Sequence, residues 1–201
     1  MNRLLIRGGR LADPVNGIDA LRDILIEGET IRAVEPALTP GDDTAVLEAA
    51  GRVVLPGLVD SHVHIASRPE GYAMLARAGV TAALDMNGDP VAMAAGLQAA
   101  STGLTVGFLY PVAPGNTVSG HDPDAAELNR VAREAREAGA FGLKVLGGHY
   151  PLTPRATRRV LEIAAELGLY AAVHAGTSES GSNIRGLEEL IGLAAGLPVH
   201  I

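Results

Sequence analysis

The sequence predicts an α/β fold in which short buried strands alternate with helices, preceded by a smaller unit built from strands alone. The hydrophobic pattern changes near residue 55, from short apolar runs between turns to apolar strands that alternate with helical periodicity. The strand–helix units then recur at intervals of about 25–35 residues, which is the spacing of parallel βαβ crossovers. We therefore predict two domains, residues 1–55 and residues 56–201.

The first 55 residues have the pattern of short strands and turns. An apolar run at 4–6 leads into two glycines, the segment 13–17 has turn-forming residues, and 23–34 holds two apolar runs around a central glycine. Further apolar runs follow at 45–47 and 53–55. No stretch supports a helix of useful length, so a small all-β unit is expected here.

In residues 56–201 the expected strands are 58–65, 80–86, 104–110, 142–146, 169–175 and 198–201. Helices are expected where apolar residues repeat at i, i+3, i+4 and i+7: Leu128, Val131, Ala132 and Ala135; Val160, Ile163, Ala164 and Leu167; Leu187, Leu190, Ile191 and Ala194. The second of these has Thr153-Pro154 at its start and Gly168 just past its end, residues that favour helix boundaries. Such alternation predicts a parallel sheet, either doubly wound or closed into a (β/α)8 barrel, with six countable strands.

Composition and charge exclude several classes of function. With 16 basic and 23 acidic residues the net charge is −7, which argues against nucleic acid or an anionic membrane as a partner, because both attract a basic face. No apolar stretch approaches the roughly 20 residues that cross a bilayer. The chain has no cysteine, so disulfides and thiolate metal sites are excluded. We expect a cytoplasmic protein with no membrane or nucleic-acid partner.

Two histidines, His62 and His64, lie at i and i+2 on the apolar strand 58–65. Side chains alternate between the faces of a strand, so both imidazoles project from the same side, as a pair of metal ligands requires. For this motif alone, two hydrogen-bonded histidines are the stronger interpretation. Other residues of the right type must therefore support a metal site.

Lys144, His174 and His200 each lie in or near the end of an apolar strand. In a barrel, active-site groups collect at the C-terminal ends of the strands. A lysine within an apolar strand is costly to bury as a cation, so it should be neutral, paired or modified. A neutral amine can take up CO2 to form a carbamate, an anionic ligand with two oxygens that can bridge two metals. The alternative is a lysine whose amine reaches solvent from the strand end.

The segment 55–64, Leu-Pro-Gly-Leu-Val-Asp-Ser-His-Val-His, resembles the first-strand signature of the amidohydrolase superfamily, Pro-Gly followed by two hydrophobic residues and Asp-x-His-x-His. The preceding strands resemble the N-terminal part of that family's small β-sandwich. The resemblance implies a (β/α)8 TIM barrel of the metal-dependent hydrolase type, of which this chain would hold the first six strands. It also implies that a carbamylated Lys144 lies on the fourth strand, and that His174 and His200 lie on the fifth and sixth.

Within the superfamily, Lys144 indicates the two-metal, carbamate-bridged branch, which includes ureases, dihydroorotases, hydantoinases and several deacylases. The chain departs from each named pattern. Ala66 stands where dihydroorotases carry an arginine, and Leu146 stands where ureases place a substrate-binding histidine. Hydantoinases use a tyrosine where this chain has His149, although Tyr150 follows. A less characterised deacylase or cyclic-amidase branch fits better.

His149 and Tyr150 are the candidate catalytic residues, because they follow the fourth strand and would face the mouth of the barrel, where they could polarise a carbonyl. An ordinary surface turn is an equal alternative for this segment. Weaker candidates are Asn87 and Tyr110, which end strands and could line the pocket, and His121, which is expected on an exposed loop. Arg68 could bind a carboxylate, but a solvated arginine is the simpler interpretation.

These features predict hydrolysis of a C–N bond in a small amide or cyclic amide, with two divalent metal ions, zinc by preference, and a CO2-derived carbamate on Lys144. In the family, the base that collects the water proton is an aspartate on strand eight. Ile201 directly follows His200, so we expect a C-terminally truncated chain that is inactive alone, and a homo-oligomeric whole protein. The rival predictions are a mononuclear deaminase of the same superfamily, with Lys144 as a bystander, and a catalytically dead barrel that serves as a scaffold or binding subunit.

Overall fold

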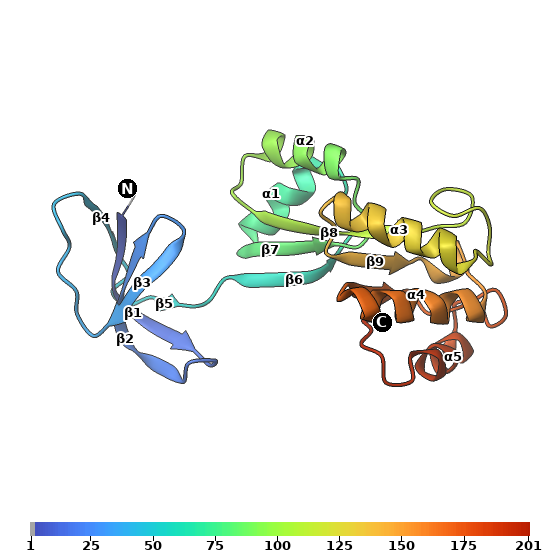
Figure 1. Cartoon of the computed structure of the whole chain (residues 1–201). Coiled ribbons are helices and arrows are strands. Elements are labelled where there is room, and N and C mark those ends of the chain that lie inside the picture. The colour runs from blue at the N-terminus through green and yellow to red at the C-terminus, as the bar shows by residue number, and fades with distance from the viewer. Residues whose placement is uncertain (1–2) are drawn as a thin grey trace. The chain divides into compact units, whose positions relative to one another are not determined.

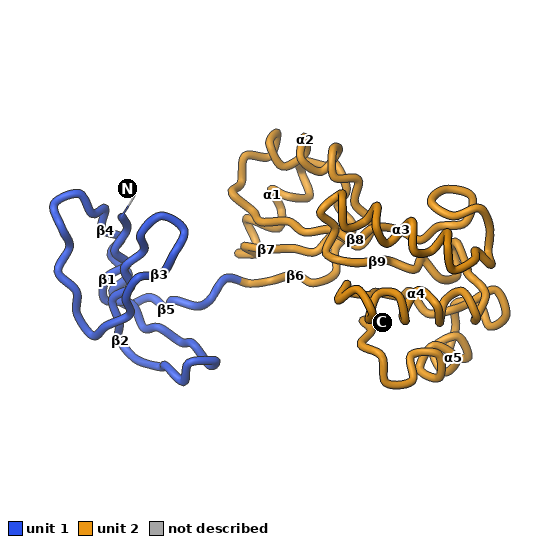
Figure 2. The backbone as a smooth tube through the Cα atoms, viewed as in Figure 1, with its two compact units in different colours: residues 1–57 blue, residues 58–201 orange. Residues whose placement is uncertain are grey.

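The computed structural model describes residues 3–201. The chain divides into two compact units, Met1–Gly57 and Leu58–Ile201, which are drawn in different colours in Figure 2. The division falls two residues after the position expected from the change of hydrophobic pattern. None of the described helices is long and apolar enough to cross a bilayer.

The described part of the first unit is built from strands, as the sequence predicts, and these form a mixed sheet. Its described strands are β1 (Arg3–Asp13), β2 (Ile18–Glu27), β3 (Thr30–Glu35), β4 (Thr44–Glu48) and β5 (Val53–Val54). The sheet order is β3-β2-β1-β4, with antiparallel β1–β2 and β2–β3 pairs, while β4 and β5 run parallel to β1. The register of β1 shifts at Gly8, whose φ is +72° and whose amide donates to the buried Asp23 carboxylate at 2.8 Å. A second Asp23 oxygen accepts from the Leu38 amide, so this carboxylate holds two segments.

The second unit is built on a parallel sheet in which the strands follow each other in chain order (Figure 1). Its strands are β6 (Leu58–Val63), β7 (Val80–Asp85), β8 (Thr105–Val112), β9 (Gly142–Val145) and β10 (Tyr170–Val173). The predicted strand 198–201 is wrong as a full strand, since it is reduced to one bridge between His200 and Ala172. Pro198 has no amide hydrogen, so it cannot extend the ladder towards the start of that segment.

Helices connect these strands. They are α1 (Pro69–Arg77), α2 (Pro90–Ala100), α3 (Ala125–Glu137), α4 (Pro154–Leu167) and α5 (Ile184–Ala194). The three helices expected from periodicity, α3 to α5, are confirmed. At the start of α4 the Thr153 hydroxyl accepts from the Ala156 amide, and Gly168 ends the helix with a φ of +65°. Helices α1 and α2 were not expected, because α2 is apolar nearly all round and α1 is short.

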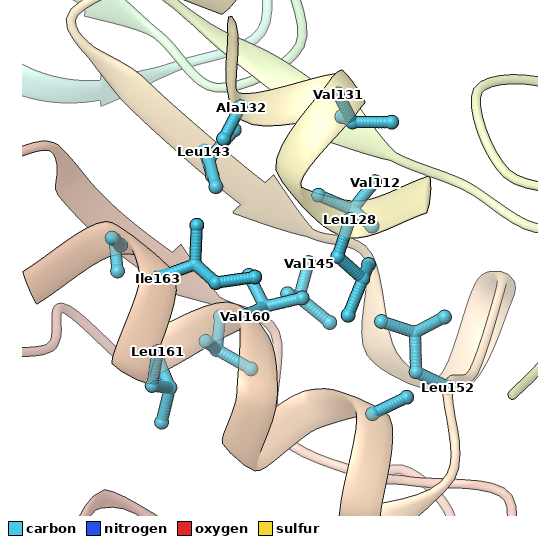
Figure 3. Packing of buried hydrophobic residues seen from close by; sticks show 14 of the residues in the cluster. Val112, Leu128, Val131, Ala132, Leu143, Val145, Leu152, Val160, Leu161 and Ile163 are labelled. Atoms are coloured by element: carbon cyan, nitrogen blue, oxygen red, sulfur yellow. The ribbon is translucent and has the colours of Figure 1, made fainter. Parts of the chain in front are cut away.

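The main hydrophobic core lies between one face of the sheet and helices α3, α4 and α5. Figure 3 shows strand residues Val112, Leu143 and Val145 packed against residues of α3 and α4 such as Leu128 and Val160. A separate cluster joins Val63, Ile65 and Ala83 to Tyr72 of α1. Burying each large side chain contributes about 1.5–3 kcal/mol, so these clusters hold the helices on one face of the sheet. The side chains on the opposite face of the sheet do not pack against these helices.

Candidate metal centre

The packing on the helix-covered face determines where the candidate ligands of β6 point. Val63 and Ile65 both belong to the cluster beneath α1. Since successive side chains of an extended segment alternate, His62 and His64 project from the face opposite the helices. Their ring centroids are 5.5 Å apart. The structure therefore brings these two imidazoles together on the inner face of the sheet.

Lys144 reaches the same inner face, because its neighbours Leu143 and Val145 belong to the main core on the outer one. The residue is only 3% exposed. Within residues 3–201, its amine has no hydrogen bond and no ion pair. Burial lowers the pKa of Lys144 below its ordinary 10.5, which favours the neutral amine.

His174 and His200 also project inward, because their neighbours Val173 and Val199 pack in the outer core. The register places Lys144 beside Ala172, and Ala172 in turn beside His200. Three neighbouring segments thus present Lys144, Ala172 and His200 at one level of the sheet. His174 follows directly after β10, one step nearer the C-terminal edge.

The inner face is strongly concave. His62 belongs to β6 at one edge of the sheet, and His200 is bridged to β10 at the other edge. Their rings nevertheless meet, with Nδ1 of His62 3.1 Å from Nε2 of His200. Only a sheet that curls towards a barrel can bring its two edges into such contact.

The candidate ligands also influence one another electrostatically. The pKa of His62 is lowered first by burial and then by the positive charges of Lys144, His200 and His64. The pKa of His174 is lowered first by burial and then by His149, Lys144 and His64. A lowered pKa favours the neutral imidazole, the form that binds a metal ion.

The chemistry of the donor set fits a metal site, although the ligands are not yet in a coordinating arrangement. In the described part of the chain, no three histidine, aspartate or glutamate side chains already converge as they would around one ion. Four imidazoles do face the same concavity, together with a buried lysine that has no counter-charge in the described part of the chain. A carbamate on Lys144 would supply the oxygen ligands that the unmodified residues lack, so the residues present fit the group that the resemblance implies.

The candidate catalytic residues lie beside this cluster. His149 ends the short 3-10 helix η1 (Gly147–His149), and its ring centroid is 5.4 Å from that of His174. Tyr150 is 51% exposed and borders a cavity of about 360 Å³ that Asn87, Asn116 and Leu146 also line. The cavity lies at the C-terminal ends of β7, β8 and β9.

Two of the weaker candidate residues, Tyr110 and His121, lie outside the cluster of candidate ligands. The expectation for Tyr110 is wrong, because its side chain packs against the main core on the outer face. On β8 it is residues 109 and 111 whose side chains point to the inner face, and the sequence pattern did not reveal this. His121 is exposed as expected, and its Nδ1 lies 2.6 Å from the carbonyl oxygen of Pro151.

Asp85, a residue that sequence reasoning did not place in the site, supports the segment that follows His64. This carboxylate is 1% exposed and accepts from the amides of Ile65 at 2.8 Å and Ala66 at 2.7 Å. Ala66 has a φ of +53°, and the Tyr72 hydroxyl donates to its carbonyl oxygen. An aspartate at the end of an apolar strand was the only signal in the sequence.

The comparisons with known proteins include close matches in sequence. No family model matches the chain. A dihydroorotase from Geobacter sulfurreducens is 33% identical over 187 residues, which cover 86% of this chain and 42% of that protein. A dihydroorotase from Anaeromyxobacter dehalogenans is 33% identical over 186 residues, covering 85% and 41% respectively. The chain therefore spans less than half the length of these curated relatives.

Solved structures share the fold. The L-hydantoinase (dihydropyrimidinase) of Arthrobacter aurescens has a TM-score of 0.69 at 16% identity, and the match covers 98% of this chain and 51% of that one. The N-acyl-D-glutamate deacylase of Bordetella bronchiseptica, solved with zinc and a phosphonate inhibitor, has a TM-score of 0.70 at 20% identity, covering 96% and 49%. The concave parallel sheet is thus part of a (β/α)8 barrel, preceded by strands of the small sandwich. With this fold, the dihydroorotase relatives and the His-x-His strand, the chain belongs to the amidohydrolase superfamily.

Proposed function

We propose that the whole protein hydrolyses a C–N bond in a small amide or cyclic amide, with two divalent metal ions held on the inner face of the barrel. The observation that carries the proposal is Lys144, a buried lysine with no acidic partner among residues 3–201, which shares a concave face with four imidazoles. An unmodified lysine there brings the cost of burial and no compensating contact. Conversion to a carbamate accounts for both its position and its lack of a partner.

The proposed ligands fall into two groups that share Lys144. His62 and His64 of the first barrel strand would hold one ion, and His174 and His200 would hold the other, with the Lys144 carbamate between them. Imidazole and carboxylate-like oxygen donors suit zinc. When bound, such a pair of ions acidifies a water molecule and polarises a carbonyl group.

The environment of Lys144 prepares it for carbamylation. Burial lowers its pKa, so the amine is neutral more often than on an exposed lysine. The neutral nitrogen forms a bond to the carbon of CO2 and releases one proton, which leaves an anionic carbamate. The product carries negative charge into a region where the other candidate ligands are neutral or cationic, so the carbamate is stabilised there.

His149 and Tyr150 are proposed to contact the substrate. His149 lies next to His174, and Tyr150 borders the cavity at the strand ends, so both could donate a hydrogen bond to a carbonyl oxygen. The names dihydroorotase and hydantoinase refer to cyclic amides, which supports a substrate of this class. Ala66 occupies the position where dihydroorotases carry an arginine, so dihydroorotate itself is not proposed.

The test is the metal content of the whole protein with and without Lys144. We expect two zinc ions per chain, with binding that depends on bicarbonate, and loss of that dependence in Lys144→Ala. A single ion bound without bicarbonate in both proteins would instead support the mononuclear deaminase. A protein that binds no metal and hydrolyses no amide would support the scaffold alternative.

A further inference from the structure

We propose that the hydroxyl groups of Tyr170 and Ser182 are positioning groups that fix the rings of His200 and His174, the two imidazoles assigned to the second metal ion. This inference rests on the proposed function, because it concerns how two of the proposed ligands are held. Neither hydroxyl belongs to a candidate ligand. Both come from β10 or from the loop that follows it.

Tyr170 is the first residue of β10 and lies on the inner face, against the cluster of Met86, Leu109 and Ala172. Its hydroxyl oxygen is 2.9 Å from Nδ1 of His200. The tyrosine ring is also held by Phe141, with the two centroids 6.0 Å apart. A hydroxyl on a packed ring of a strand is a rigid partner, so it restricts rotation of the His200 imidazole.

Ser182 holds His174 from the loop that joins β10 to α5. Its Oγ is 2.7 Å from Nε2 of His174. The next residue, Asn183, caps α5 by accepting from the amides of Arg185 and Gly186. Ser182 thus stands directly before a capped helix.

A close approach to η1 holds this loop in place. A Cβ atom on Gly148 would come within 2.5 Å of the Cβ of Ser182, so only a glycine allows the two segments to lie this close. The position of the Ser182 hydroxyl is therefore determined from two sides, by the helix that follows it and by η1.

These contacts leave a defined nitrogen of each ring for a metal ion. An imidazole has two ring nitrogens, and a hydrogen bond at one of them selects the other as the ligand atom. His200 would bind through Nε2, with Nδ1–H donating to Tyr170, and His174 would bind through Nδ1, with Nε2–H donating to Ser182. Nε2 of His200 now contacts His62, so a metal ion would replace that contact.

The two halves of the proposed site differ in this respect. In the described part of the chain, neither His62 nor His64 has a hydroxyl partner at a ring nitrogen. Among the described residues, the one hydrogen-bonding partner of the His62 ring is His200, another candidate ligand. Loss of the Tyr170 or Ser182 hydroxyl should therefore lower the affinity for the second ion while the first ion still binds normally.

The experiment titrates the metal-free whole protein with Co²⁺ and follows its visible absorption, in the presence of bicarbonate. We expect two equivalents for the wild type. In Tyr170→Phe and Ser182→Ala the first equivalent should bind normally, and the affinity for the second should fall about 10–100-fold, the usual effect of removing a ligand's hydrogen-bond partner. Ser182→Thr keeps a hydroxyl and should restore the second equivalent.

Two matched variants serve as controls. Tyr110→Phe removes a hydroxyl on the outer face. Ser180→Ala removes a hydroxyl that lies in the same loop as Ser182 and donates to Glu189 of α5, so both variants should bind two equivalents normally. Wild-type affinity for both equivalents in Tyr170→Phe and Ser182→Ala would overturn the inference alone. Equal loss of both equivalents together with a lower melting temperature would also overturn it, in favour of a folding role. Absence of metal binding by the wild type would overturn the proposed function and the inference with it.

Discussion

His62 and His200 are in direct contact, with 3.1 Å between Nδ1 of the first and Nε2 of the second, although they come from opposite edges of the parallel sheet. This contact ties the start of the barrel to its last bridged residue. Both rings are candidate ligands, and Nε2 of His200 is the nitrogen that we assign to a metal ion, so metal binding would replace this contact. Under the proposed function, metal binding would therefore be coupled to the curvature of the sheet.

The first prediction follows from this coupling. Zinc at 100 times its dissociation constant should raise the free energy of unfolding of the metal-free whole protein by about 2.7 kcal/mol for each ion bound, because it binds only the folded state. His62→Ala should remove the part contributed by the first ion, to which His62 is assigned. Urea unfolding with and without zinc measures both values. Equal stabilisation of the wild type and His62→Ala would show that zinc binds elsewhere.

The second prediction concerns Asp85. Asp85→Asn should lower the free energy of unfolding by about 2 kcal/mol, because one carboxylate oxygen accepts from Ile65 and Ala66 and the other from Asn87, and the amide replaces one of these acceptors with an NH2 donor. It should also lower the affinity for the first metal ion, since His64 immediately precedes Ile65 and Ala66. Urea unfolding and metal titration are the measurements.

Asp89→Asn is the matched control for Asp85→Asn. Asp89 caps α2 by accepting from the Ala92 amide, and asparagine caps helices about as well as aspartate. This control should change stability by less than about 0.5 kcal/mol. The role given to Asp85 is wrong if the two variants behave alike.

Much of the fold could be predicted from the sequence because its elements obey simple periodicities. The inward side chains of His62, His64 and Lys144 follow from strand alternation, and α4 follows from its apolar spacing and its caps. The grouping of all the candidate ligands as one metal site stays a prediction. Helix α2 was missed because an apolar residue occupies nearly every position, which leaves no polar face to detect.

The supporting contacts of the site could not be predicted in the same way. The bonds from Tyr170 to His200 and from Asp85 to Ile65 join residues 20–30 positions apart on different segments, and no local pattern specifies such a partner. It was also ambiguous which side chains of β8 point to the inner face, because both faces of that strand are apolar. A buried parallel strand lacks the polar alternation that would distinguish its faces.

The third prediction concerns acid stability. Hydrogen bonds from Arg155 and then Thr153 lower the pKa of Asp122 below its ordinary 3.8. In the unfolded chain this carboxyl has its ordinary pKa of 3.8, so it takes up a proton more readily there than in the folded protein. The interaction between Asp122 and Arg155 therefore stabilises the fold at pH values above that ordinary pKa. The contribution is lost as the pH falls through the lowered pKa. Asp122→Asn should therefore unfold with less dependence on pH in the acidic range than the wild type.

Arg155→Met tests the same pair from the other side, since it removes the cation and leaves the carboxylate. Both variants should show a reduced acid dependence in urea unfolding at about pH 3 and about pH 7, with the larger reduction in Asp122→Asn, because Thr153 still donates to the carboxylate in Arg155→Met. The double variant should behave like Asp122→Asn, because Arg155 acts through that carboxylate. Wild-type acid dependence in both single variants would contradict this assignment.

The fourth prediction compares two glycines of the barrel unit. Gly147 has a φ of +52°, and a Cβ atom there would lie 2.0 Å from the carbonyl oxygen of His174. Gly147→Ala should therefore push the His174 segment away and cost about 2–4 kcal/mol of stability. Gly192 lies inside α5 with open space around it, so Gly192→Ala should stabilise the protein by about 0.5–1 kcal/mol.

Metal titration separates the effect of Gly147 on the site from its effect on folding. At a temperature where Gly147→Ala remains folded, the affinity for the second ion should fall while the first ion binds normally, because His174 is assigned only to the second. Gly192→Ala should bind both ions as the wild type does. Normal binding of two ions by folded Gly147→Ala would mean that the η1 segment does not position His174, and that the imidazole is held by Ser182 alone.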